Sequence, residues 1–250
     1  VPNGVFDNGP MERILADLFT SDGRTNDFRK LRRKLYVVAT EVSTGHSVRF
    51  GEPGLDHVPI SRAIQASTAL PGLYPPVAID GRDYADGALL RTMNASLLLD
   101  DGAQFVICLN PLVAFDASRA PRHRNDGYSR RHDLSRSGLP TVLSQTFRAM
   151  IQSRMQVGMR TYKLGYPHAD VLLFEPDCGD EEMFFQNVFR YADRKRLTER
   201  AYQRTRRDML AQADGLEKML GRHGLGLRRD VPDILHAADV DGIDRNALLG

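Results

Sequence analysis

The pattern of apolar and polar positions along this chain predicts helices and strands that follow one another over most of its length. Helices are predicted over residues 11–19, 60–70, 94–100 and 141–162, and a long basic helical stretch over 180–221. Short apolar runs predict strands over 35–40, 104–109 and 169–174. Because strands that alternate with helices are typical of layered folds, we expect an α/β domain with three α/β/α layers around a largely parallel central sheet.

The segment 60–88 carries the most detailed pattern in the chain. Its helix is rich in small residues, namely Ala63, Ala66, Ser67 and Ala69. A helix with so smooth a surface can approach a sheet or another helix closely, and we therefore expect it to be buried. Pro71 and Gly72 end this helix, since proline cannot continue the hydrogen-bond ladder and glycine accepts the left-handed turn.

A hairpin follows this helix. Asp80-Gly81 lies between two alternating runs, which is the pattern of a two-residue type I′ turn, where both central residues need a positive φ. The return strand covers residues 82–85 and leaves Asp86 at the point where the strand gives way to Gly87 and Ala88. At such a strand end the carboxylate can point away from the sheet edge, and its two small neighbours do not block access to it. Taken alone, an Asp-Gly pair after a strand is more often only a turn.

Composition narrows the class of protein. The chain has 250 residues, 42% of them hydrophobic, which is enough for a substantial core. No apolar run approaches the roughly 18 residues of a membrane-spanning helix. The two cysteines, Cys108 and Cys178, have no metal-ligand spacing and make no disulfide framework, and the seven histidines include no metal-binding pair. We therefore expect neither a metal nor an organic cofactor.

Several motifs occur in a set order. After the strand over 35–40 come Thr44-Gly45, then residues 64–72 with the sequence Ile-Gln-Ala-Ser-Thr-Ala-Leu-Pro-Gly, then the triplet Asp86-Gly87-Ala88. The triplet is a weak signal by itself, but in this order and spacing the set resembles the patatin-like phospholipases. The resemblance runs from about residue 35 to about residue 111, and it implies the same three-layer α/β architecture.

The resemblance also implies a catalytic role for Asp86. Members of this family hydrolyse lipid esters with a dyad of serine and aspartate, in which the aspartate takes the proton of the serine hydroxyl directly. A carboxylate has a pKa near 3.9 in water and is a weak base there, but burial raises its pKa and makes proton transfer easier. The family stabilises the oxyanion with backbone N–H groups of a glycine-rich loop.

The nucleophile of such a dyad is not recognisable in this sequence. A nucleophile elbow has glycine two residues on either side of its serine. Ser43 has Gly45 after it but Glu41 before it, and Ser47 has Gly45 before it but Arg49 after it. Three explanations stay open: a longer polypeptide that includes an N-terminal part with the serine, a two-piece enzyme, or a protein that has lost its nucleophile.

The C-terminal half differs in character. We expect residues 1–175 to form the C-terminal part of a patatin-like α/β domain, with residues 115–140 as a mobile loop or insertion, and residues 176–250 to form a basic helical extension. Basic residues gather in two clusters, the first with Arg119, Arg122, Arg124, Arg130, Arg131 and Arg136, the second with Arg194, Lys195, Arg196, Arg200, Arg204, Arg206 and Arg207.

These clusters allow two interpretations. Charge runs of this kind are usually a solvated loop and a solvated helix face. The functional alternative is peripheral contact with an anionic membrane surface, worth about 1 kcal/mol for each basic side chain near the headgroups. Nucleic acid is not expected as a partner, since no recognised binding motif accompanies the charge.

The sequence therefore predicts a lipid acyl-ester hydrolase of the phospholipase A or lysophospholipase type. Asp86 is the expected general base, in the motif Asp86-Gly87-Ala88, with the serine supplied by sequence N-terminal to Val1. The expected substrate is a phospholipid or another lipid ester. The compartment stays open, with the cytoplasm or a peripheral membrane position expected. The alternative is a catalytically inactive module on the same scaffold that binds lipid or a protein partner.

Overall fold

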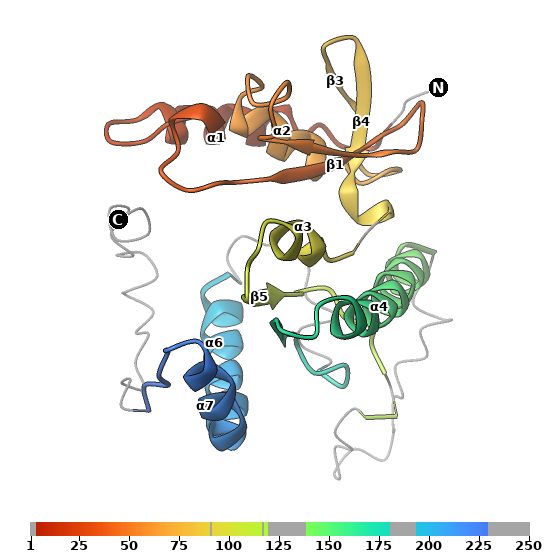
Figure 1. Ribbon diagram of the computed structural model, residues 1–250. Helices are drawn as coiled ribbons and strands as arrows, with labels where there is room; N and C mark the ends of the chain where they lie inside the picture. Colours follow the sequence, from red (N-terminus) through yellow and green to blue (C-terminus); the bar gives the residue numbers. More distant parts are fainter. Residues whose placement is uncertain (1–3, 91, 117, 120–138, 181–193, 230–250) are drawn as a thin grey trace. The chain divides into compact units, whose positions relative to one another are not determined.

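The computed structural model describes residues 4–90, 92–116, 118–119, 139–180 and 194–229 (Figure 1). Contacts divide the chain into two compact units, Val1–Asn94 and Ala95–Gly250. The boundary predicted from the sequence at residue 175 stays a prediction. The predicted loop over 115–140 lies for the most part outside the described residues.

The first unit combines helices with one four-stranded sheet. Its elements are α1 (Gly9–Thr20), η1 (Phe28–Lys30), β1 (Val37–Glu41), β2 (Ser47–Phe50), α2 (Ile60–Ser67), β3 (Val77–Ile79), β4 (Arg82–Asp86) and η2 (Gly87–Leu89). The strand order is β2-β1-β4-β3, and every neighbouring pair is antiparallel. The helices predicted over 11–19 and 60–70 and the strand predicted over 35–40 are confirmed, with ends that differ by at most three residues, the largest difference being the end of α2 at Ser67.

The predicted hairpin is also confirmed. Asp80 has a φ of 50° and Gly81 a φ of 75°, and Ile79 faces Arg82 across the turn. Two positive φ angles in a two-residue connection define the type I′ geometry that fits the twist of the flanking strands. The turn therefore fixes the register of β4 and with it the position at which that strand ends.

Helix α2 lies in the core of this unit, as its small residues predict. Ala63 and Ala66 are fully buried together with Ala39 of β1 and Phe50 of β2. The aromatic rings of Phe50 and Tyr84 meet edge to face, with centroids 5.2 Å apart. Because alanine side chains are short, the helix axis comes close to the strands, and the chain that leaves α2 passes directly beside β4.

Buried polar contacts tie α2 to α1 and to the residues just before and after α1. The Ser61 hydroxyl, which is fully buried, donates to Glu12 Oε1 at 2.8 Å and accepts from Asn26 Nδ2 at 2.9 Å. The Ser61 N–H donates to Asn26 Oδ1 at 2.8 Å, so Asn26 caps the start of α2. Farther along α2, Gln65 Nε2 donates to Asn8 Oδ1 at 2.9 Å.

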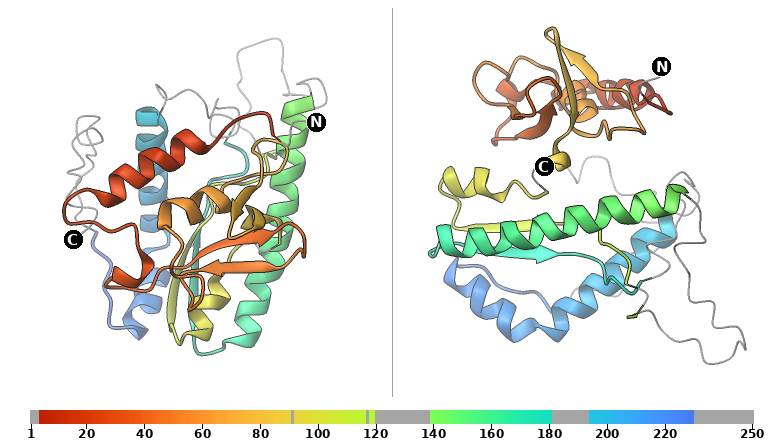
Figure 2. Two further views of the ribbon diagram at one scale, coloured as in Figure 1. Left: turned by 90° about the horizontal axis from the view of Figure 1, so that it is seen from above. Right: turned by 90° about the vertical axis from the view of Figure 1, so that its right-hand side faces the viewer.

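The second unit contains the parallel strands. Its described elements are α3 (Ala95–Asp100), β5 (Phe105–Leu109), α4 (Leu139–Gly165), β6 (Asp170–Phe174), α6 (Arg194–Ala211) and α7 (Ala213–Arg222). Strands β5 and β6 are parallel, with Phe105 opposite Asp170. Figure 2 shows α4 on one side of these strands and α6 and α7 on the other. The helices and strands predicted here are confirmed, except that residues 181–193 of the predicted helical stretch lie outside the described part.

The expected largely parallel central sheet is not found among the described strands. The larger sheet is antiparallel throughout, and β5 and β6 form the only parallel pair described. The reason lies in the connections: β1 and β2 are joined by residues 42–46, and β3 and β4 by Asp80-Gly81. Connections this short return the chain alongside itself and cannot carry the crossover that a parallel pair needs. The chain therefore has an α/β fold in which the three-layer parallel arrangement is not shown.

The bond network of Ser61 leads to a stability prediction. Ser61→Ala removes the donor to Glu12 and leaves Asn26 Nδ2 without its buried acceptor, so we expect the free energy of unfolding to fall by about 1–3 kcal/mol. Urea denaturation followed by circular dichroism measures the change. Ser47→Ala, at an exposed strand position, is the matched control and should change stability little. Equal stability of both variants would contradict the structural role of Ser61.

Candidate active site

Asp86 lies where the sequence predicts it, at the end of β4. It is the last residue of that strand and faces Ala39 of β1, and the short helix η2 begins at the next residue. The hairpin register and the end of the strand thus deliver one carboxylate to a fixed place. The position of Asp86, Gly87 and Ala88 in the fold agrees with the strand exit that the sequence pattern indicates.

The Asp86 carboxylate is half-buried and has one hydrogen bond that holds it. Oδ1 accepts from the Ala88 N–H at 2.8 Å, and no second partner of this side chain occurs in the described part of the chain. Burial raises the pKa of Asp86 above its ordinary value, and the bond from Ala88 opposes that rise to a smaller extent. The carboxylate is therefore a stronger base than an aspartate in water.

The backbone of Asp86 is held on both sides. Its N–H donates to the carbonyl oxygen of Ala69 at 3.0 Å, in the segment that leaves α2. Its carbonyl oxygen accepts from Thr40 Oγ1 at 3.1 Å. Two segments that are distant in sequence, the chain after α2 and the strand β1, therefore fix the peptide groups that carry the carboxylate.

Gly87 has a steric reason to be glycine. A Cβ atom at this position would lie 2.5 Å from the carbonyl oxygen of Val38, and real Cβ atoms essentially never lie below 3.0 Å from another heavy atom. The chain thus crosses directly over β1 as it leaves the sheet. The motif Asp86-Gly87-Ala88 combines a carboxylate, a residue without a side chain at the crossing, and the N–H that orients the carboxylate.

An apolar segment adjoins the loop that holds Asp86. The carbonyl oxygen of Leu73 accepts from the N–H groups of Val5 and Phe6, at 2.9 and 2.8 Å. Val5, Phe6 and Leu73 are exposed, whereas Tyr74 packs against the core and lies 6.3 Å from the Phe6 ring. The side chains near the exit of α2 are therefore apolar and open to solvent.

No serine of the described residues bonds the Asp86 carboxylate. The Ser43 hydroxyl donates to Glu41 Oε1 at 3.1 Å in the turn after β1, and Ser61 is held by Glu12. Two described histidines also have carboxylate partners elsewhere: His57 bonds Asp80 and His223 bonds Asp170. No serine or histidine among the described residues is thus bonded to the Asp86 carboxylate.

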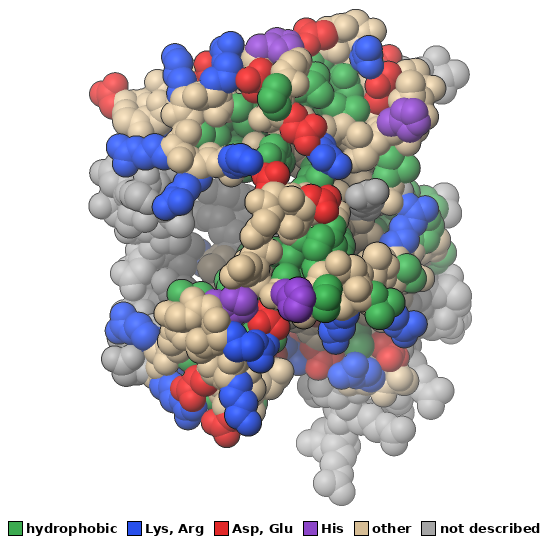
Figure 3. Space-filling view, viewed as in Figure 1, with side chains coloured by type: hydrophobic (Ala, Val, Ile, Leu, Met, Phe, Trp, Pro, Cys, Tyr) green, Lys and Arg blue, Asp and Glu red, His purple; other side chains and the backbone are tan. Residues whose placement is uncertain are grey.

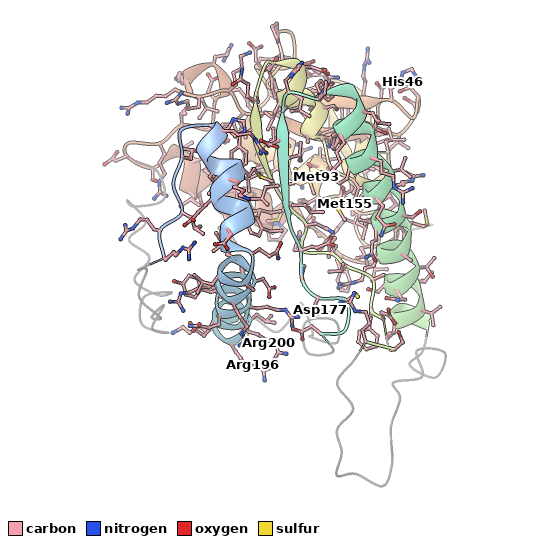
Figure 4. The ribbon with its side chains drawn as sticks, turned by 60° about the horizontal axis from the view of Figure 1, so that its bottom comes forward. His46, Met93, Met155, Asp177, Arg196 and Arg200 are labelled. Atoms are coloured by element: carbon pink, nitrogen blue, oxygen red, sulfur yellow. The ribbon has the colours of Figure 1, made fainter. Side chains whose placement is uncertain are left out.

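Acidic side chains pair with two members of the second basic cluster. Arg200 bonds the fully buried carboxylate of Asp180 at 3.0 Å, and Arg204 bonds both Asp180 and Asp177. Asp177 and Arg200 lie near each other at one end of the second unit (Figure 4). Figure 3 shows acidic and basic side chains interspersed on the face drawn there. Of the first cluster, Arg119 alone lies within the described residues, 3.9 Å from Asp177.

The described residues match the patterns of neither of two further features, a metal site and a membrane-spanning helix. No group of three or more metal-ligating side chains occurs among them. None of their helices has the length and apolar character that a membrane crossing needs.

Comparison with protein families gives a match to the N-terminal part of the chain. The family model of the patatin-like phospholipases matches residues 1–99, a range that contains α2, the hairpin and Asp86. The resemblance predicted from the sequence motifs is thereby confirmed for this part of the chain. This part therefore resembles a family of lipid acyl hydrolases that act on lipid substrates.

The crossing at Gly87 leads to a second prediction. Gly87→Ala forces a Cβ against the Val38 carbonyl, so the end of β4 must shift, and we expect the free energy of unfolding to fall by about 1–3 kcal/mol. Gly215→Ala in α7 is the matched control, because no atom lies within 4 Å of a Cβ there and alanine favours the helix. Chemical denaturation of both variants measures the difference. A Gly87→Ala protein as stable as the unmodified chain would refute the crossing geometry.

Proposed function

We propose that this protein is a lipid acyl-ester hydrolase of the phospholipase A or lysophospholipase type, with Asp86 as the general base of a Ser-Asp dyad. The main support is the Asp86 carboxylate itself: it is half-buried, its pKa is raised by burial, and one oxygen is oriented by the Ala88 N–H at 2.8 Å. The nucleophile serine and the glycine-rich oxyanion loop come from sequence N-terminal to Val1 in this proposal.

The reaction that follows from this assignment has two halves. Asp86 takes the proton of the serine hydroxyl as the serine oxygen bonds to the ester carbonyl carbon, and backbone N–H groups stabilise the oxyanion. The ester C–O bond then breaks, and Asp86 gives the proton to the leaving alcohol. A water molecule releases the fatty acid in the second half, with Asp86 again taking and returning one proton.

The direction of the pKa shift sets the expected pH dependence. Asp86 acts as a base only when its carboxylate is ionised, so the rate should rise with pH as that group loses its proton. Because burial raises the pKa of Asp86, this rise should occur at a higher pH than for a solvent-exposed aspartate. The same shift makes the ionised form a better proton acceptor.

The proposed partners are a lipid substrate and a membrane surface. A phospholipid or another lipid ester agrees with the family match over residues 1–99. Peripheral contact with anionic lipid is proposed as well, although Asp177 and Asp180 already hold Arg200 and Arg204 of the second cluster. The contact would therefore depend on other basic side chains, such as the exposed Arg207.

A catalytically inactive lipid-binding or partner-binding module is the second candidate. It is favoured by one observation: no serine of the 250 residues has glycine two positions away on both sides. The coding sequence upstream of Val1 separates the two candidates. A Gly-x-Ser-x-Gly pattern after an apolar strand there supports the hydrolase, and its absence supports the inactive module.

Replacement of the base tests the dyad in the protein that includes the nucleophile segment. Asp86→Asn keeps the size of the side chain and its bond from Ala88 but removes the base, so esterase turnover should fall by about two to four orders of magnitude. Hydrolysis of a short-chain p-nitrophenyl ester measures the rate. Circular dichroism should show an unchanged fold, because an amide fits the same turn.

Asp80→Asn is the control for this measurement. Asp80 lies at the other end of β4, with a φ of 50° in the hairpin turn, and asparagine adopts that conformation as readily. The Asp80 side chain bonds His57 and does not contact Asp86. Turnover of this variant should therefore stay within about twofold of the unmodified rate, as expected for a surface substitution. Full activity in both variants would mean that Asp86 is only a turn residue.

A further inference from the structure

We propose that Thr40 of β1 is the positioning residue for the Asp86 base, an inference that rests on the proposed function. The Thr40 hydroxyl donates to the carbonyl oxygen of Asp86 at 3.1 Å, and only 5% of Thr40 is exposed. The side chain touches neither the Asp86 carboxylate nor a reacting atom in this assignment. Thr40 acts through the backbone of Asp86, whose carboxylate takes the proton.

The register of β1 and β4 explains why the Asp86 backbone needs partners other than the backbone ladder of this strand pair. In an antiparallel pair, residues alternate between positions that exchange ladder bonds and positions that do not. Val42 N–H donates to the carbonyl oxygen of Asp83, and Ala39 faces Asp86 three positions farther along. Asp86 thus occupies a position without ladder bonds. Its N–H donates to the Ala69 carbonyl oxygen instead, and its carbonyl oxygen accepts from the Thr40 hydroxyl.

The Thr40 bond acts on the peptide that joins Asp86 to Gly87. This peptide contains the carbonyl that Thr40 holds, and its orientation sets the path of the chain toward Ala88. Ala88 N–H in turn donates to Asp86 Oδ1 at 2.8 Å. If the peptide rotates, the Ala88 N–H moves away from the carboxylate. The Thr40 hydroxyl therefore influences where the carboxylate oxygens of Asp86 lie, because it holds the peptide that leads to the Ala88 N–H.

A purely structural role is the competing interpretation, in which Thr40 only satisfies a buried carbonyl. Loss of a buried hydroxyl would then reduce stability without changing the turnover of the molecules that remain folded. A positioning role predicts instead a loss in kcat with little change in KM, because an aspartate displaced by a fraction of an ångström still leaves substrate binding intact.

Kinetics of Thr40→Val in the protein with its nucleophile segment test the proposal. Valine keeps the branched shape and removes the donor, so kcat should fall about tenfold while KM changes less than about twofold. Thr40→Ser returns the hydroxyl and should restore kcat to within about threefold. Ser61→Ala, which loses a buried hydroxyl bonded to Glu12 instead, should keep its kcat. Equal losses in the valine and serine variants would overturn the proposal.

A second readout uses the 250-residue chain and does not depend on activity. Hydrogen exchange of the Ala88 amide, followed by NMR, should be about tenfold faster in Thr40→Val and unchanged in Thr40→Ser. Should valine prevent folding, Thr40→Ala gives the same test. Faster exchange in a protein without esterase activity supports the positioning role while the proposed function fails. Unchanged exchange of Ala88 in Thr40→Val overturns the positioning role, whatever the activity.

Discussion

The close approach of the chain to β1 at Gly87 is the constraint on which the candidate site depends. Only a residue without a side chain can pass the Val38 carbonyl, since a Cβ would lie 2.5 Å from it. The strand β4 therefore ends at Asp86, and the carboxylate lies at the exit, with its backbone held by Ala69 and Thr40. The small residues of α2 serve the same arrangement, because a helix with larger side chains would keep Ala69 farther from β4.

Burial then sets the chemistry of this carboxylate. An aspartate held by a single N–H in a half-buried place keeps a raised pKa, whereas several donors or a nearby cation would lower it. Asp170 shows the opposite case in the second unit, where Arg222 and His223 lower the pKa of its carboxyl. The two aspartates lie at strand ends in the same chain, and the burial of one and the charged partners of the other make the first a candidate base and the second an ion-pair partner.

Local signals predicted most of the first unit. Asp80-Gly81 predicts a type I′ turn because such a turn depends on residues adjacent in sequence, whereas the helix expected to continue to Pro71-Gly72 already ends at Ser67. The bond between Thr40 and Asp86 joins residues 46 positions apart, and no sequence pattern indicates it. The strand order of the sheet could not be predicted from the sequence either. The alternation of helices and strands favours a parallel sheet, whereas the short turn around Thr44-Gly45 makes β1 and β2 antiparallel.

The titration of Asp86 tests the central claim most directly. Carboxyl carbon shifts of the aspartates, followed by NMR against pH in the 250-residue chain, give the pKa of Asp86 once its signal is assigned by its absence in Asp86→Asn. The structure predicts a midpoint above the value of about 3.9 that is typical of an exposed aspartate. A midpoint at or below that value would contradict a buried, weakly hydrogen-bonded carboxylate, and with it the assignment of Asp86 as the general base.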